Sequence, residues 1–356
     1  MDKGEFYERL ARRPKIEIVP EAGEEEHWQK SFSEANDITL YSWRNDWLKN
    51  TKENLDYFGY FNRDHSVKVF FNELIKEPVV LVGAGPSLAK NIDKLKMAKE
   101  RGIKIMAVHH AVMYLAQEQY QIKPDYVVML DAGAMWGDYT KHDGMDFKDV
   151  PLLADQTCNS EQLKAWEGPK YFYKSTQPEN SSIGKFLKME MGRIIDPLKQ
   201  GSIIEVGGHA MGAMISLARG VMRAETLAIV GSDYCFSPET KKFYPFDMKI
   251  DNEVDGKDFG AEGKKLPAAP PAQGMIFDIF GNMVETNGAY LSFKNVMDQA
   301  IKANVIGAMQ AGENFEVINA CEGGTLGALK GGLSKWMQYL MLEDAVEYII
   351  AKKAIK

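Results

Sequence analysis

The stretch VVLVGAGPSLAKNIDKL, residues 79–95, joins an apolar run to a turn whose residue types can bind phosphate. Its glycines permit backbone angles that are closed to other residues, and they let a ligand come close to the main chain. The amides and the dipole at the start of the following helical pattern attract anions. Gly83, Gly85, Pro86 and Ser87 are therefore candidate nucleotide-binding residues, and Ser87 can either cap the helix or bind a phosphate oxygen.

This turn matches neither of the two familiar phosphate-binding motifs in full. No Gly-Lys-Ser/Thr sequence follows, which excludes a Walker loop, and the third glycine of a dinucleotide fingerprint is missing. A tight turn without a ligand is therefore the alternative interpretation.

A second glycine turn, Gly207-Gly208-His209, lies between a short apolar run and another helical pattern. We count both glycines as nucleotide-binding candidates for the same reasons as in the first turn. His209 would lie in the first helical turn, where a side chain that titrates near neutral pH can move a proton. A surface or capping histidine is the alternative. His109 and His110 follow another predicted strand and can face the same cleft.

Three acidic residues end predicted strands beside glycines: Asp131, Asp233 and Glu322. Asp131 can accept a ribose hydroxyl, bind a cation or act as a base, and we count it among the nucleotide-binding candidates. Asp233 follows a Gly-Ser pair and Glu322 precedes two glycines, so both are candidate catalytic residues, together with His209. Helix caps, loop salt bridges and structural turns are the alternative roles. No HxH or HExxH spacing indicates zinc, and the sequence leaves the metal content open.

Alternating apolar runs and helical patterns predict how these residues are positioned. Regular β-α-β alternation implies an α/β, Rossmann-like fold, in which a mainly parallel sheet carries helices on both faces. Ligands of such sheets bind at the carboxyl ends of the strands. We therefore expect the glycine turns and the carboxylates to converge on a single cleft.

The pattern also predicts a domain organisation. Residues 76–330 form the nucleotide-binding domain, residues 1–75 a small N-terminal cap of helices and loops, and residues 331–356 a C-terminal helix. Residues 237–275 mix charged residues with Gly and Pro, which is typical of a lid-like loop. The segment that follows is expected to form a hairpin that turns at Gly281.

The composition excludes several classes of protein. The chain has 356 residues, a net charge of −7 and a pI near 5.6, which argue against a nucleic-acid partner. Its three cysteines include no CxxC pair, which fits a reducing compartment. No apolar run approaches about 18 residues, and the charged N-terminus lacks the apolar segment of a signal peptide. We therefore expect a cytoplasmic protein without a membrane partner, and a homo-oligomer stays open.

Taken in order, the motifs VGAGPSL, KPDYVVMLD, VGGHAMGAMISLA, IVGSDYCF and VINACEGG resemble those of the motility accessory factor family. Members of that family are bacterial glycosyltransferases that add nonulosonic, sialic-acid-like sugars to flagellin. Their core is similar to that of the MptE-like family of archaeal 6-hydroxymethylpterin diphosphokinases. The first motif also resembles the GxGPSL loop with which one bacterial sialyltransferase family binds the cytidine nucleotide of CMP-sialic acid. The resemblance covers roughly residues 78–330.

The resemblance implies transfer of a nonulosonic sugar from a CMP-activated donor to a hydroxyl group of a protein or glycan acceptor. It implies that the turn at Gly83 holds the donor phosphate and that Asp131 contacts the ribose. Asp233, Glu322 or His209 would then deprotonate the acceptor or support the leaving phosphate. No cofactor is certain on this interpretation.

The related diphosphokinases would instead require ATP and Mg²⁺. They are expected to carry closely spaced acidic residues at the end of the third strand, where this chain reads MLDAGAMW with one aspartate. The segment NACEGG resembles the corresponding segment of the glycosyltransferases, so we expect sugar transfer. A non-catalytic nucleotide-binding protein is the third alternative.

Overall fold

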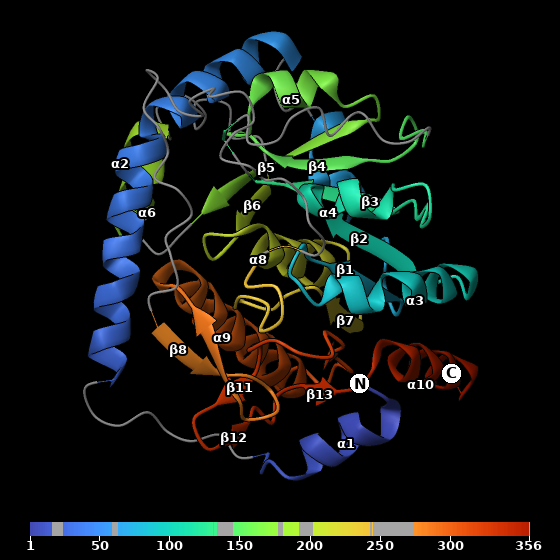
Figure 1. Cartoon of the computed structure of the whole chain (residues 1–356). Coiled ribbons are helices and arrows are strands. Elements are labelled where there is room, and N and C mark those ends of the chain that lie inside the picture. Colours follow the sequence, from blue (N-terminus) through green and yellow to red (C-terminus); the bar gives the residue numbers. More distant parts are fainter. Residues whose placement is uncertain are drawn as a thin grey trace.

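A nine-stranded sheet forms the centre of the protein, for which we describe a computed structural model (Figure 1). The structure describes residues 1–15, 24–58, 63–130, 132–133, 145–176, 181–191, 202–242, 244 and 274–355. The strand order is β13-β10-β7-β1-β2-β3-β4-β5-β6, and each pair of neighbours in it is parallel. These findings confirm the predicted α/β fold. The strands are β1 (Pro78–Val82), β2 (Lys104–Val108), β3 (Tyr126–Met129), β4 (Leu152–Asp155), β5 (Lys170–Thr176), β6 (Ser202–Glu205), β7 (Thr226–Val230), β10 (Glu316–Asn319) and β13 (Gln338–Tyr339).

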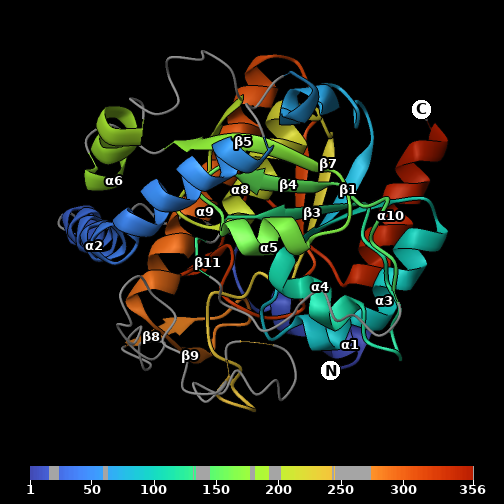
Figure 2. The same ribbon diagram turned by 90° about the horizontal axis from the view of Figure 1, so that it is seen from above.

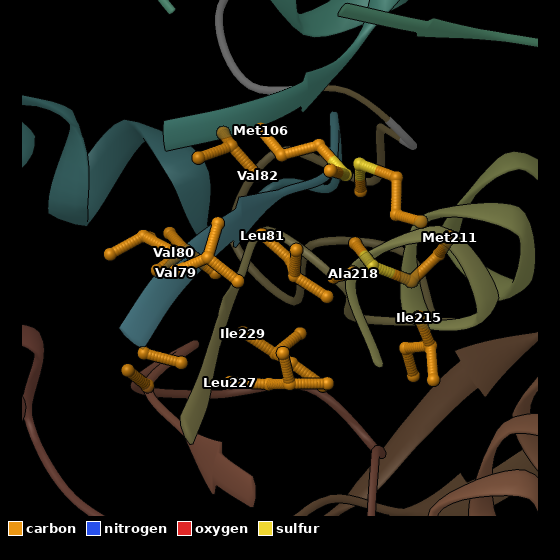
Figure 3. Close-up of a cluster of buried hydrophobic side chains, with 14 of the residues drawn as sticks. Val79, Val80, Leu81, Val82, Met106, Met211, Ile215, Ala218, Leu227 and Ile229 are labelled. Atoms are coloured by element: carbon orange, nitrogen blue, oxygen red, sulfur yellow. The ribbon is translucent and has the colours of Figure 1, made fainter. Parts of the chain in front are cut away.

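Strands β1 and β7 are central because their sequences, PVVLV and TLAIV, are apolar at nearly every position. All ten of their residues are buried, as expected for parallel strands that are covered on both faces. Leu81 pairs with Met106 of β2 on one side and with Ile229 of β7 on the other. Figure 3 shows these side chains together with Met211 and Ile215 of the neighbouring helix.

The strand order reverses between β1 and β7. After β1 the chain adds strands in one direction as far as β6, and it then returns to place β7 on the other side of β1. Such a reversal opens a crevice at the carboxyl ends of the two strands, where ligands of open α/β sheets bind. The sheet topology therefore places the turns after β1 and β7 at the expected binding edge.

Helices lie on both sides of the sheet, with α3 and α10 running together along one of them (Figure 2). The helix α3 begins directly after the first glycine turn and ends before Gly102, which has a φ of 72°. The helices that follow β1 are α3 (Leu88–Glu100), α4 (His109–Leu115), α5 (Ser160–Ala165), α6 (Ser182–Phe186) with the π-helical turn η3 (Leu187–Met191), α8 (Ala210–Ile215) with the π-helical turn η5 (Ser216–Val221), α9 (Gly288–Gln310) and α10 (Leu342–Ile355).

The N-terminal region consists of helices and 3₁₀ turns that pack around the sheet (Figure 1). Its elements are α1 (Lys3–Ala11), the 35-residue helix α2 (Glu24–Phe58), and the 3₁₀ turns η1 (Arg63–His65) and η2 (Val67–Phe70). The side chain of Asn50 donates to the carbonyls of Ala132 and Thr157, and Asn54 donates to those of Gln156 and Cys158. Two buried amides thus fix α2 to the loops that follow β3 and β4.

Of two elements that the sequence predicts near the C-terminus, the structure confirms one and changes the start of the other. The predicted hairpin at Gly281 is present as β8 (Gly274–Phe277) paired with β9 (Met283–Thr286). The helix predicted from residue 331, however, begins only at Leu342. Residues 328–333 form the small antiparallel pair β11 (Ala328–Leu329) and β12 (Gly332–Leu333) instead, and β13 then extends the main sheet. Glycines and strand pairing therefore override the helical pattern there.

The region predicted as a lid, residues 237–275, lies largely outside the described residues, which include only 237–242, 244 and 274–275 of it. Within the described parts of the chain, no helix is both long and apolar enough to span a bilayer.

We expect Leu81→Ala to lower the free energy of unfolding by about 2–5 kcal/mol, because Leu81 is fully buried between β2 and β7 and its truncation leaves a cavity. Urea unfolding monitored by circular dichroism measures this loss. Met309→Ala is the control, since Met309 is 68% exposed and its truncation should change stability by no more than about 0.5 kcal/mol. Equal midpoints for the two variants would contradict the assignment of Leu81 to the core.

Candidate functional site

The turns after β1 and β7 are joined through their backbones. The Gly83 amide donates to the carbonyl of Val230, and the Gly85 amide donates to that of Gly231, each over 2.8 Å. A Cβ atom on Gly83 would lie 2.3 Å from the Gly231 oxygen, a distance that no real side chain could keep. Glycine is therefore required for this close approach, and two amides of the turn are already satisfied within the protein.

The anion held at the start of α3 is the protein's own Asp233. The Ser87 amide donates to Asp233 Oδ2 over 2.9 Å, and Asp233 is 4% exposed. The carboxylate lies between two glycines, since a Cβ on Gly85 would be 2.3 Å from Oδ2 and one on Gly324 would be 2.6 Å from Oδ1. The sequence-predicted residues Gly83, Gly85, Ser87 and Asp233 thus come together, with Pro86 inside the same turn.

Ser87 does not cap α3 with its side chain. The first amides of the helix instead bond to carbonyls of the turn, with Leu88 N donating to Gly85 O and Lys90 N donating to Ser87 O. The Ser87 hydroxyl is buried and makes no well-formed hydrogen bond to a described residue. The capping alternative is therefore not observed, and the hydroxyl stays beside the carboxylate of Asp233.

Burial raises the pKa of Asp233 from 3.8 to about 6, and the bond from Ser87 and the charge of Lys90 oppose this rise only in part. A carboxyl group in such a place exchanges a proton close to neutral pH, as general acids and bases must. The combination of burial and a helix-terminal amide makes Asp233 the described carboxylate best suited to proton transfer here.

A third turn, after β10, binds the backbone of Asp233. Both the amide and the hydroxyl of Thr325 donate to the Asp233 carbonyl, over 2.8 and 2.9 Å. Tyr234, the next residue, has a φ of 54°, which turns the chain sharply after the carboxylate. The predicted EGG segment thus reaches the site through Gly324 and Thr325.

Glu322 itself is directed elsewhere. Its two carboxylate oxygens accept from Lys94 Nζ over 2.7 and 3.0 Å, and Oε1 also accepts from the Leu342 amide over 3.0 Å. The side chain is 7% exposed, so this ion pair joins α3 to the first residue of α10. A catalytic role for Glu322 stays a prediction, and its observed contacts are structural.

His209 is the N-cap of α8 rather than a residue of its first turn. Its Nδ1 accepts from the Gly212 amide over 3.1 Å, after two glycines with positive φ at 207 and 208. Burial lowers the pKa of His209 to about 3, although the Phe293 backbone favours the protonated form. The imidazole is therefore neutral at physiological pH, with its acceptor nitrogen committed to the helix.

Aromatic side chains that sequence reasoning missed surround His209 and Asp233. The His209 ring lies 4.9 Å from Phe293 and 5.8 Å from Tyr234, measured between ring centroids. Tyr244 lies 6.4 Å from His110 by the same measure, and the rings of His109 and His110 are 3.9 Å apart. The sequence signal that could have pointed to these aromatic side chains was Tyr234, which directly follows Asp233.

A buried ion pair in α9 was also missed. Lys294 Nζ lies 2.7 Å from Asp298 Oδ2, and Asp298 Oδ1 accepts from the Gly327 amide, which fixes the third turn. The Lys294 side chain is only 5% exposed. A Lys–Asp pair four residues apart usually marks a solvated helix face, so the sequence carried no sign of its burial.

Three features complete the description of the site and its surroundings. Asp131 lies outside the described residues, although Leu130 and Ala132 on either side of it are described. Within the described ranges, no three histidine, cysteine or acidic side chains gather as metal ligands. A hollow of about 880 Å³ opens between α2 and α6, lined by residues such as Tyr41, Arg44 and Met189, none of which belongs to the glycine turns.

We expect Gly85→Ala to lower the free energy of unfolding by about 1–3 kcal/mol, because the new methyl group would overlap Asp233 and the Gly231 carbonyl. Thermal unfolding measures the change. Gly323→Ala, in the third turn, is the matched control: a Cβ there meets nothing within 4 Å, so stability should stay within about 1 kcal/mol of the parent. A stable Gly85→Ala protein would show that the turns are not in contact.

We expect the His209 ring to show no titration between pH 5 and 8, because burial lowers its pKa to about 3. Long-range ¹H–¹⁵N spectra of the folded protein report this, and the urea-unfolded chain is the control in which the ring titrates normally. The unfolded state binds this proton more tightly, so the stabilising contribution is present above about pH 6.5 and is lost as the pH falls towards 3. A folded-state titration near neutrality would contradict the buried N-cap.

A solved structure, the MAf glycosyltransferase from Magnetospirillum magneticum AMB-1, is similar with a TM-score of 0.48 and 14% sequence identity. The similarity covers 78% of this chain and 37% of that one, so this chain spans well under half of that enzyme's length. A search of curated proteins found no match.

The family profile described as 6-hydroxymethylpterin diphosphokinase MptE-like matches residues 46–239, which include the first two glycine turns and Asp233. This match spans more than half of the chain, and the chain therefore belongs to the 6-hydroxymethylpterin diphosphokinase MptE-like family.

Proposed function

We propose that this protein is a transferase that moves a nonulosonic sugar from a CMP-activated donor to a hydroxyl group of a protein or glycan acceptor. The observation that carries the proposal is the position of Asp233: a carboxyl group with a pKa of about 6 accepts a hydrogen bond from the Ser87 amide, directly before α3, at the edge where α/β sheets bind nucleotides. A donor phosphate bound at this edge would lie beside a proton donor.

The glycine turn after β1 would bind the donor phosphate. Ala84, Gly85 and Pro86 are partly exposed there, whereas Ser87 is buried behind them. The dipole of α3 favours a negative charge at this position. Gly207 and Gly208, in the second turn, would border the nucleotide, and Asp131 would contact the ribose.

In the reaction, the bond between the anomeric carbon and the phosphate oxygen breaks, and its electron pair leaves with the CMP phosphate. Protonated Asp233 supports that leaving oxygen by donating a hydrogen bond or its proton. The acceptor oxygen forms the new bond on the opposite face of the sugar, so configuration inverts, and its proton passes to water, from which Asp233 is protonated again. Positioned acid catalysis of this kind contributes about 10²–10⁴-fold in rate.

The other two candidates play smaller parts in this scheme. His209 is neutral and its Nδ1 accepts from the Gly212 amide, so it would orient the acceptor rather than remove a proton. Glu322 would keep α3 in place through Lys94. Neither assignment changes the role of Asp233.

The family description favours a second candidate, an ATP-dependent diphosphokinase that acts on a pterin-like alcohol. In that reaction a diphosphoryl group passes from ATP to the alcohol oxygen, and AMP leaves. The same turn would hold the triphosphate, and Mg²⁺ would be needed to neutralise it. The single aspartate in MLDAGAMW makes this the less favoured of the two.

Isothermal titration calorimetry with CMP and with ATP plus Mg²⁺ distinguishes the candidates, followed by product analysis with a CMP-activated sugar. We expect CMP to bind and to be released as product. Asp233→Asn should lower the transfer rate by at least about 100-fold, since it removes the proton donor. Asp149→Asn is the control, because Asp149 is an exposed carboxylate paired with Lys123. If the protein binds ATP with Mg²⁺ but not CMP, and releases AMP as product, it is the diphosphokinase instead.

A further inference from the structure

We propose that Asp233 is a proton-controlled gate on the anion site at the start of α3. Its ionised carboxylate occupies the Ser87 amide and repels an incoming anion, whereas its protonated form admits one. The inference rests on the proposed function, because it explains how that same site would exchange an internal anion for the phosphate of a ligand.

The hydrogen bonds of the turn supply the first step of the argument. The amides of Gly83 and Gly85 bond to β7 and the turn after it, and those of Leu88 and Lys90 bond to carbonyls of the glycine turn before α3. Ser87 N is the amide that holds a negative group, and that group is Asp233 Oδ2 at 2.9 Å. An external phosphate can therefore use the Ser87 amide only in competition with Asp233.

Two buried hydroxyl groups near the Asp233 carboxylate supply the second step. Ser87 and Ser232 are 4% and 5% exposed, and neither hydroxyl oxygen makes a well-formed hydrogen bond to a described residue, although that of Ser87 faces the Asp233 carboxylate and that of Ser232 faces Tyr234. A buried polar atom without a partner costs free energy that a ligand can recover. The Ser87 hydroxyl, close to the Ser87 amide and the Asp233 carboxylate, can donate to a tetrahedral oxyanion bound there, and the Ser232 hydroxyl, from the residue before Asp233, is a second candidate donor.

The charges around Asp233 supply the third step. The groups that face it come from α3 (Ser87 and Lys90), the segment after β7 (Tyr234 and Cys235), α9 (Tyr290) and the turn after β10 (Cys321). Burial raises the pKa of both tyrosines and both cysteines, so they stay neutral at physiological pH. The Lys90 side chain is 51% exposed, and its Nζ also lies 3.9 Å from Oε1 of Glu239.

Two further groups lie behind Tyr234. His209 is neutral because burial lowers its pKa to about 3, and Asp298 is bound by Lys294 and by the Gly327 amide. Among the described groups in contact with the Ser87 amide, Asp233 alone changes its charge between pH 5 and 8. Anion binding and protonation of this carboxyl group are therefore linked.

The linkage has a definite size. If an anion binds only when Asp233 is protonated, its dissociation constant grows by the factor 1 + 10^(pH − pKa). With a pKa of about 6, this factor is close to one at pH 5 and about 30 at pH 7.5. We therefore expect affinity to fall about 30-fold between these two pH values.

Sulfate is the probe, because a phosphate monoester itself titrates near pH 6 whereas sulfate keeps its charge across this range. ¹H–¹⁵N spectra of the full chain follow the Ser87 amide during sulfate titrations at pH 5 and pH 7.5. We expect the resonance to shift with a dissociation constant that is about 30-fold weaker at the higher pH. In the reverse direction, saturating sulfate should raise the pKa of Asp233, measured from its ¹³C carboxyl resonance, a readout that needs no variant.

Two variants sharpen the test. Asp233→Asn mimics the protonated form and should bind sulfate equally well at both pH values. Glu239→Gln removes a neighbouring exposed carboxylate that does not touch the Ser87 amide, and it should keep the 30-fold dependence. The spectra of each variant show whether it is folded.

Several results would overturn the gate. They are a wild-type affinity that does not change with pH, weaker binding by Asp233→Asn than by the parent at pH 5, or no sulfate response of the Ser87 amide in either protein. Failure of the proposed function appears separately: a protein that ignores CMP but binds sulfate with the expected pH dependence keeps the gate and loses the sugar transfer.

Discussion

The hydrogen bond from the Ser87 amide to the Asp233 carboxylate is the interaction on which the site depends. It joins the first turn of α3 to the end of β7 across the point where the strand order of the sheet reverses. The glycines on either side serve this bond, because a side chain at Gly85 or Gly324 would occupy the space of the carboxylate oxygens. Removing the bond would leave a buried carboxylate without its hydrogen-bond donor, which is costly in free energy.

A buried carboxylate that costs stability, as the raised pKa of Asp233 shows, needs a reason to be kept. An uncharged hydroxyl or amide could accept the Ser87 N–H without that cost. The protein instead holds Asp233 by its carbonyl through Thr325 and by its side chain through Ser87. Groups held this firmly in an unfavourable charge state are typical of functional sites, where a proton must move.

Local sequence signals predicted much of the fold but few of the side-chain contacts within the site. The runs PVVLV and TLAIV, the turn at Gly83 and the hairpin at Gly281 each depend on neighbouring residues, and the structure has all of them. The strand β4, with the sequence LLAD, was not identified from the sequence. The contact of Asp233 with Ser87 spans 146 residues, and that of Glu322 with Lys94 spans 228. Such pairings follow from the sheet topology, which no short motif encodes.

The two carboxylates of adjacent turns show how partners decide a role that residue type leaves open. In sequence, Asp233 and Glu322 were equivalent candidates: each ends a strand and lies beside glycines. Glu322 meets a lysine at 2.7 Å and the amide that begins α10, so its charge is matched and it connects two helices. Asp233 meets an amide, and no cation among the described residues is in hydrogen-bonding contact with it, so its charge is only partly matched and its proton stays exchangeable. Environments that separate two carboxyl groups in this way assign structure to one and proton chemistry to the other.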